Sequence, residues 1–205
     1  MILGITGGTG CGKTTLLNLI REHGGLVLDC DAIYHELLRT DAVLLQKIES
    51  RFPGTVTDGV LDRKKLGSIV FSDAAALTDL NAITHSAIRA EVQRRLMGYS
   101  GLAAIDAIAL FEGGLASLCQ MTVAVTAPRE DRILRIMARD GISREYAASR
   151  VDAQHGDAWF VQRCDKVLEN SGTQESFQRE CLAFLRSANI IELSLHRKGE
   201  HHHDY

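Results

Sequence analysis

A glycine-rich segment near the start of the chain carries a lysine and threonines at a spacing that can grip phosphate. Gly7–Thr14 fits the pattern Gly-x-x-x-x-Gly-Lys-[Ser/Thr], with an apolar run before it and a helical pattern after it. Lys13 could reach the β- and γ-phosphates, and the Thr14 hydroxyl could hold Mg²⁺. The loop and first helical turn offer phosphate contacts from Gly8, Gly10, Cys11, Gly12, Lys13, Thr14 and Thr15. The segment predicts a site for a nucleoside triphosphate and Mg²⁺.

Two acids follow the next apolar run. Asp29-Cys30-Asp31 stands where a second strand would end, and the carboxyl ends of parallel strands face the ligand crevice. Asp31 should therefore lie near the γ-phosphate, where a carboxylate can accept a proton from an attacking hydroxyl or orient water on Mg²⁺. The alternative is that Asp31 caps a helix beginning at Ala32, and the two roles are compatible.

A third group of candidate residues is rich in arginine. Arg132, Arg135 and Arg139 share one helical face at positions i, i+3 and i+7. Guanidinium groups that close over a transferring phosphoryl group stabilise its negative charge. Asp140-Gly141 supplies a turn at which such a lid could hinge. An ordinary solvated basic helix face is the competing interpretation.

Apolar runs alternate with helical patterns, which indicates an α/β fold with a mostly parallel sheet. With the phosphate loop, this predicts a P-loop three-layer α/β/α fold with a five-stranded parallel sheet. The expected strands are Ile2–Thr6, Leu26–Cys30, Leu102–Leu110, Thr122–Thr126 and Asn189–Leu193. Helices are expected from Gly12 to about His23 and from about Ala32 to Arg51.

A long helical stretch without a strand lies between Asp62 and Tyr99, with Asp62 and Asp73 as expected N-caps. Such an excursion predicts a helical lobe over the ligand cleft. The expected division is a nucleotide-binding core of residues 1–61 and 100–205, with a lobe of residues 62–99. A helix should start near Pro128, and Thr173 should cap the last one. The His201–His203 stretch could bind metal, but a solvated tail is the simpler interpretation.

The bulk properties describe one ordinary domain. The chain has 205 residues, 45% hydrophobic and 24% charged, with a net charge of −3. This balance gives no electrostatic case for nucleic acid or an anionic membrane as a partner. No apolar run approaches membrane-spanning length and no signal peptide is expected, so the cytoplasm is the expected compartment.

The five cysteines lack the spacing of a disulfide framework or a zinc site, and they include no Cys-x-x-Cys pair. Cys11 differs from the others because it sits in the phosphate loop at a helix N-terminus, which should lower its thiol pKa. One hypothesis is that ATP protects Cys11 from alkylation. The alternative is a tolerated small residue at a variable loop position.

Nucleotide binding alone does not decide between three classes of protein: a transferase, a switch GTPase and a motor. The chain contains neither the Asn/Thr-Lys-x-Asp motif that reads guanine nor an Asp-x-x-Gly switch, and it leaves little room for a motor's lever. The acid and arginine groups favour a kinase.

Taken together, these motifs resemble the dephospho-coenzyme A kinase family, over almost the whole chain to about residue 185. The matching segments are Gly4–Thr15, Leu28–Asp31, Asp58–Gly67, Ile83–Arg89, Leu110–Glu112, Arg135–Gly141 and Asp165–Gly172. Two departures are Ser86 after His85 and Ile108 before the Leu-Phe-Glu end of a strand, where the family generally has proline. These changes affect backbone stiffness near the acceptor rather than a charged group.

The resemblance implies transfer of phosphate from ATP to the ribose 3′-hydroxyl of dephospho-CoA, giving coenzyme A and ADP. Lys13, Asp31 and Arg139 would be catalytic, with Asp31 as the base. Arg135 and Asn170 would contact ATP, with Asn170 near the adenine. Residues from about 135 to 155 would form the lid, and the acceptor would be faced by Asp31, Arg63, His85, Arg89 and Glu112.

A monomer or weak homo-oligomer with small-molecule substrates is expected. Another P-loop small-molecule or nucleotide kinase is one alternative. A catalytically idle ATP-sensing protein is a second.

Overall fold

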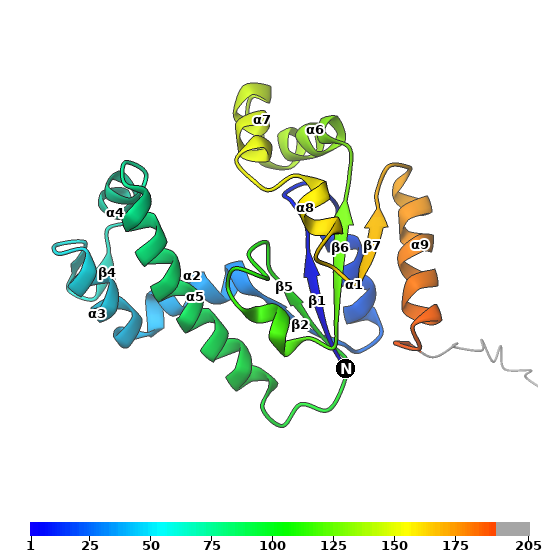
Figure 1. The fold of residues 1–205 in the computed structure, drawn as a ribbon, viewed down its shortest axis with the longest axis horizontal. Coiled ribbons are helices and arrows are strands. Elements are labelled where there is room, and N and C mark those ends of the chain that lie inside the picture. The colour runs from blue at the N-terminus through cyan, green and yellow to red at the C-terminus, as the bar shows by residue number, and fades with distance from the viewer. Residues whose placement is uncertain (192–205) are drawn as a thin grey trace, which may run out of the picture.

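The computed structural model of the chain describes residues 1–191 and centres on a five-stranded parallel sheet in the order β2-β5-β1-β6-β7 (Figure 1). The strands are β1 (Ile2–Thr6), β2 (Leu26–Asp29), β5 (Ala103–Asp106), β6 (Met121–Thr126) and β7 (Lys166–Glu169). The α/β fold with five parallel strands is confirmed. The central strands are buried on both faces, which explains their continuous apolar sequences.

The fifth strand is not the one predicted from sequence. Lys166–Glu169 pairs with β6, whereas Asn189–Ile191 forms the turn after the last helix, and residues 192–193 lie outside the described part of the chain. An edge strand exposes part of its surface, so β7 mixes the exposed Lys166 and Glu169 with the buried Leu168. The segment therefore lacks the continuous apolar sequence by which the central strands were predicted.

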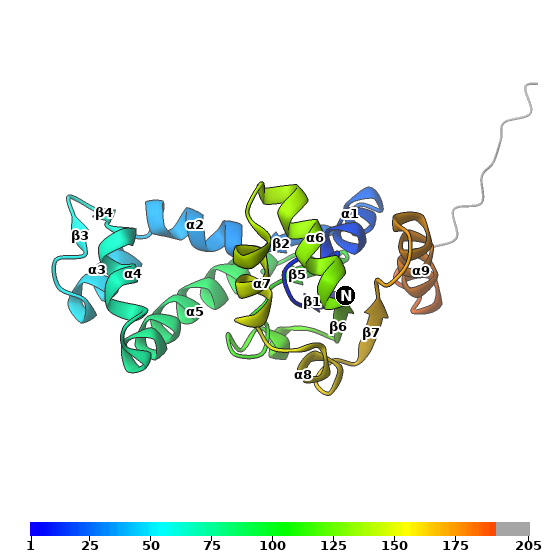
Figure 2. The same ribbon diagram turned by 90° about the horizontal axis from the view of Figure 1, so that it is seen from above.

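Helices cover both faces of the sheet. The helix α1 (Lys13–Glu22) packs beside α9 (Gln174–Ser187) on one face, while α5 (Ala74–Leu96) and α8 (Asp157–Val161) lie on the other (Figure 2). The first face buries residues such as Ile5, Leu16 and Phe177. The arrangement gives the expected three layers.

The helix predicted from Ala32 to Arg51 is two helices, α2 (Cys30–Thr40) and α3 (Ala42–Arg51). They separate at Asp41, whose carboxylate accepts hydrogen bonds from the N–H groups of Val43 and Leu44 at 2.9 and 3.0 Å. An N-cap of this kind starts a new helix with a changed direction. The predicted caps at Asp62, Asp73 and Thr173 are confirmed by side-chain hydrogen bonds.

A lobe projects away from the sheet at the left of Figure 1. It contains α3, the short hairpin β3 (Val56–Thr57) and β4 (Val60–Leu61), the helix α4 (Arg63–Val70) and part of α5. The helix α5 contacts α2, α3 and α4. Buried apolar residues of these helices form one cluster, which connects the lobe to the core.

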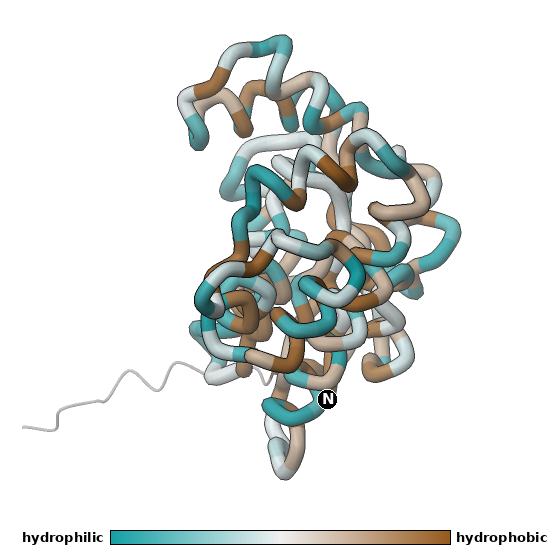
Figure 3. Tube along the Cα trace, turned by 90° about the vertical axis from the view of Figure 1, so that its left-hand side faces the viewer, coloured by the Kyte–Doolittle hydropathy of each residue, from teal (hydrophilic) through white to brown (hydrophobic). Residues whose placement is uncertain are grey.

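The lid expected at about 135–155 corresponds to parts of two helices, α6 (Arg129–Asp140) and α7 (Arg144–Asp152), which pack on each other through Ile133, Ile136 and Ala147. Gly141 adopts a φ of 65° at the end of α6, which confirms the predicted turn. Figure 3 shows the lid standing above the body of the molecule, with hydrophilic residues interspersed among hydrophobic ones. Among the described helices, none combines the length and apolar character needed to cross a membrane.

Candidate active site

A polar cleft opens at the carboxyl end of the sheet, with a volume of about 410 Å³. Lys13 and Thr14 line it from the phosphate loop, and Asp31 lines it from the first turn of α2. Arg135 and Arg139 line it from the lid. Residues more than 120 positions apart in the sequence thus meet around one space, as phosphoryl transfer requires.

Hydrogen bonds from distant side chains hold the phosphate loop in shape. Gly7 has a φ of 132°, a value that side-chain-bearing residues rarely adopt, and its carbonyl accepts a hydrogen bond from Lys13 Nζ at 2.9 Å. Gln154 bonds the backbone N–H and the hydroxyl of Thr9, both at 2.8 Å, and Arg132 Nε donates to the Thr9 carbonyl at 3.0 Å. A loop braced in this way offers its amides to phosphate with little reorganisation.

Asn170 braces the same loop from the opposite side. Its side chain is buried, and Nδ2 donates to the Cys11 carbonyl at 2.9 Å while Oδ1 accepts from Arg135 at 3.3 Å. A Cβ on Gly12 would collide with this amide, so the close approach requires glycine there. The loop-bracing contacts were not foreseen from sequence. The adenine contact suggested for Asn170 stays a prediction.

The lowered thiol pKa expected for Cys11 is not found. The side chain is about 1% exposed beneath the loop, and burial raises the pKa of its thiol, although Lys13 acts in the opposite direction. Desolvation therefore outweighs the effect of the helix N-terminus on the thiolate. The hypothesis of ATP protecting an accessible Cys11 thiol loses its basis.

The capping alternative for Asp31 is also wrong. The N-cap of α2 is Asp29, whose carboxylate accepts from the Ala32 N–H at 3.0 Å. Asp31 lies within the first turn and lines both the polar cleft and an adjoining, less polar cavity. It therefore lies where the two spaces meet.

Asp106 is a site residue that the sequence analysis missed. It ends β5, directly opposite Asp29 in the sheet register, and it lines the polar cleft. One carboxylate oxygen is buried without a hydrogen-bond partner. Burial raises the Asp106 pKa to about 6, helped by Asp29 and Asp31 and opposed by Lys13. The only sequence signal was an acid inside the apolar run taken as one strand, Leu102–Leu110, which in fact ends at Asp106.

Asp106 should make the stability of the metal-free protein depend on pH. Its folded-state pKa of about 6 lies above the ordinary aspartate pKa of 3.8, so the folded state favours the protonated form. The resulting stabilisation is present below pH 3.8 and is lost as pH rises through 6, by at most about 3 kcal/mol. Melting curves in EDTA between pH 5 and 8 should show the Tm difference between Asp106→Asn and the wild type growing with pH. A constant difference would contradict the assignment.

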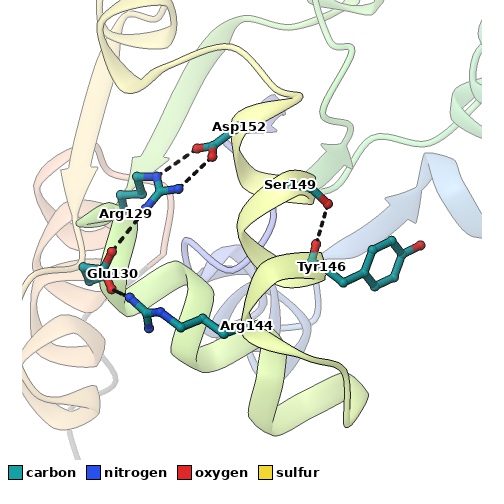
Figure 4. Close-up of polar contacts among 6 residues, drawn as sticks. All are labelled: Arg129, Glu130, Arg144, Tyr146, Ser149 and Asp152. Atoms are coloured by element: carbon teal, nitrogen blue, oxygen red, sulfur yellow. Dashed lines mark hydrogen bonds and ion pairs between the residues drawn. The ribbon is translucent and has the colours of Figure 1, made fainter.

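The lid arginines divide into two groups. Arg135 and Arg139 reach the cleft as predicted, together with Arg150 from α7, which sequence reasoning did not single out for the site. Arg132 is buried and turns onto Thr9 instead. Arg129 pairs with Asp152 outside the phosphate cleft (Figure 4). The interpretation as a solvated basic face is therefore wrong for the buried Arg132, whereas the Arg139 side chain is 58% exposed.

The adjoining cavity has a volume of about 260 Å³ and a largely apolar lining. It shares Asp31 and Ile108 with the polar cleft and is lined from α5 by His85. Tyr34 and Asn81 also line it, and neither was singled out from the sequence. A second substrate occupying this cavity could present one group to Asp31.

Three residues predicted to face the acceptor lie outside this cavity lining. Arg63 is exposed at the start of α4. Arg89 donates to the Gly114 carbonyl and to Ser117 Oγ. Glu112 pairs with His155 Nε2 at 3.0 Å. Ser86, one of the two departures, is exposed and does not line the cavity.

Comparison with known proteins points consistently to one family. A family model described as dephospho-CoA kinase matches residues 1–176. A dephospho-CoA kinase from Deinococcus radiodurans is 38% identical over 192 residues, covering 92% of both chains. One from Carboxydothermus hydrogenoformans is 35% identical over 191 residues, covering 90% of this chain and 93% of the relative.

Solved structures agree. The Thermus thermophilus protein TT1252 is 36% identical with a TM-score of 0.76, covering 91% of this chain and 97% of the other. A dephospho-CoA kinase from Campylobacter jejuni is 28% identical with a TM-score of 0.65, covering 91% and 96%. A shikimate kinase from Bacteroides thetaiotaomicron shares the fold at 11% identity, with a TM-score of 0.57 and coverage of 92% and 98%.

Proposed function

The chain belongs to the dephospho-CoA kinase family, and from that membership we propose how its residues transfer phosphate from ATP to the ribose 3′-hydroxyl of dephospho-CoA. The observation that carries the assignment of roles is a single cleft holding Lys13, Asp31 and Arg139, with a second cavity meeting it at Asp31. The product is coenzyme A, and ADP leaves.

In the reaction, the 3′-oxygen forms a bond to the γ-phosphorus as the bond from that phosphorus to the β–γ bridging oxygen breaks. The electron pair of the broken bond leaves on ADP, and the hydroxyl proton passes to Asp31. Lys13 holds the β- and γ-phosphates, and Arg139 neutralises charge that builds on the transferring group. Closing the lid excludes water, which would otherwise compete as an acceptor.

The residues of the cleft fit a magnesium ion. The Thr14 hydroxyl and the Asp106 carboxylate, with its partnerless buried oxygen, face the same space and would hold it. When bound with ATP, Mg²⁺ supplies positive charge to the phosphates. Within residues 1–191 no group of three or more His, Cys, Asp or Glu could hold a metal, so phosphate oxygens and water would complete the coordination.

The acceptor is assigned to the cavity beside Asp31. His85 would contact it there, and the lobe of residues 62–99 would form its outer wall, with the lid of about 135–155 closing above. Arg63 and Arg89 remain candidates for its pyrophosphate, which favours guanidinium donors. Glu112 lies in the loop after β5 and pairs with His155. From there it would influence the acceptor indirectly, through the position of this loop.

The remaining expectations concern the setting of the enzyme. We place it in the cytoplasm as a monomer or weak homo-oligomer, acting on small molecules. Five free cysteines in the described part of the chain agree with a reducing compartment.

An acceptor panel tests the function. With Mg²⁺ and ATP, ADP release should depend on dephospho-CoA and exceed that with adenosine, AMP or CMP by about 10²-fold or more, because a mismatched acceptor leaves polar site groups unpaired. ADP release measured without acceptor is the control. Equal use of AMP or CMP would indicate another small-molecule or nucleotide kinase. ATP binding without acceptor-dependent ADP release would indicate the idle ATP-sensing protein.

A further inference from the structure

One carboxylate in the lid holds two arginines at once. Asp140, the last residue of α6, accepts hydrogen bonds from Arg139 Nε at 2.7 Å and from Arg139 Nη2 at 3.0 Å. Its Oδ2 atom also accepts from Arg150 Nη1 at 2.6 Å. Because Arg150 belongs to α7, this carboxylate joins the two lid helices across the Gly141 turn.

The shared carboxylate leaves hydrogen-bond donors available on both arginines. Arg139 and Arg150 both line the phosphate cleft with Lys13, whereas Asp140 does not. Within residues 1–191, Nη1 of Arg139 and both Nε and Nη2 of Arg150 make no hydrogen bond. Each guanidinium is therefore anchored by one edge and offers another edge to an anion, which is the geometry of bidentate phosphate binding.

The position of Asp140 also calls for a partner. A carboxylate at the C-terminal end of a helix lies beside the negative end of the helix dipole, which disfavours it. Arg139 and then Arg150 lower the Asp140 pKa to about 2, so the carboxylate stays ionised. The Asp140 carboxylate in return offsets the repulsion between the two positively charged guanidinium groups. It also holds both arginine side chains in place, so that they lose less rotamer freedom when they bind phosphate.

We propose that Arg150 is a second phosphate-binding arginine and that Asp140 is a positioning residue that presents Arg139 and Arg150 as a pair to the triphosphate. The proposal rests on the proposed function only in taking the cleft as the ATP site. It adds one phosphate ligand from α7 and one residue that acts through both arginines.

The same lid supplies a matched control. Asp152 accepts two hydrogen bonds from Arg129, at 2.8 and 2.7 Å, where the start of α6 meets the end of α7 (Figure 4). Neither of these residues lines the phosphate cleft. Asp152→Asn therefore removes a comparable ion pair from the same two helices without touching the site.

The test compares Arg150→Gln, Asp140→Asn, the double variant and Asp152→Asn. We expect Arg150→Gln to lower kcat/KM for ATP by about 10²-fold, as the loss of one transition-state donor does. Asp140→Asn should lower kcat by about tenfold through misplacement of the pair. The Asp140→Asn effect should shrink when Arg150 is already Gln, because the residues act together. Asp152→Asn should retain wild-type kinetics.

Binding gives a second readout, with the non-hydrolysable analogue AMP-PNP and Mg²⁺ in calorimetry. Arg150→Gln should bind AMP-PNP more weakly, while thermal unfolding shows that the variant is folded. Asp140→Glu should recover part of the lost kcat. Fully additive effects, or unchanged kinetics and AMP-PNP affinity in Arg150→Gln, would overturn the proposal. So would a higher kcat in Asp140→Asn, since Asp140 would then restrain the arginines. Wild-type transfer to dephospho-CoA in the same assay keeps the proposed function separate from these outcomes.

Discussion

Lys13→Ala should lower kcat/KM for ATP by about 10³-fold or more. Lys13 Nζ lies in the cleft, 2.9 Å from the Gly7 carbonyl, at the end of a loop fixed by Thr9 and Asn170 contacts. Alanine leaves the loop amides in place but removes the positive charge that faces the β- and γ-phosphates. Steady-state kinetics with dephospho-CoA as acceptor measure the loss.

Lys65→Ala is the matched control for this prediction. Its ammonium also donates to a glycine carbonyl, that of Gly54 at 2.7 Å, but on the lobe and outside the cleft. It should change kcat/KM by less than about threefold, because surface contacts contribute little. A folded Lys13→Ala protein that keeps more than a tenth of wild-type kcat/KM would contradict the role of Lys13.

Asp31→Asn should lower kcat by about 10²–10⁴-fold, the contribution that a general base makes to proton transfer. Asparagine has nearly the same shape but cannot take the proton of the 3′-hydroxyl. Because the proton moves only in the transition state, KM for ATP should change little. Kinetics at saturating ATP and dephospho-CoA separate the two constants.

Asp41→Asn serves as the control for Asp31→Asn. Asp41 caps α3 outside the cleft, and asparagine caps a helix as well as aspartate does, so turnover should stay at the wild-type level. Nearly full turnover in Asp31→Asn would remove Asp31 as the base and leave it a ligand of the substrate or of magnesium-bound water.

The parts of the site that were predictable are local in sequence. The phosphate loop needs its glycines, Lys13 and Thr14 within eight consecutive positions, and the strand and helix around it follow from periodicity. Asp31 followed from a general rule, that strand ends of a parallel sheet face the ligand. The same rule would have identified Asp106, had the end of β5 been placed correctly.

What could not be predicted depends on contacts between distant segments. The end of β5 is set by pairing with β1 and β2 and not by its own residues, which continue apolar beyond Asp106. Arg150 reaches the cleft because α7 packs on α6, and Arg132 of α6 turns onto the distant Thr9 carbonyl. The burial of Cys11 likewise comes from the sheet beneath the loop.

The most direct test of phosphate transfer to dephospho-CoA follows the γ-phosphorus of ATP. Wild-type protein is incubated with Mg²⁺, dephospho-CoA and ATP labelled in the γ-phosphate, and the product is separated and its phosphate position assigned by phosphorus NMR. We expect the label to appear on the ribose 3′-oxygen of coenzyme A in equal amount to the ADP formed. Label that stays in ATP, passes to inorganic phosphate, or appears at another oxygen would contradict it.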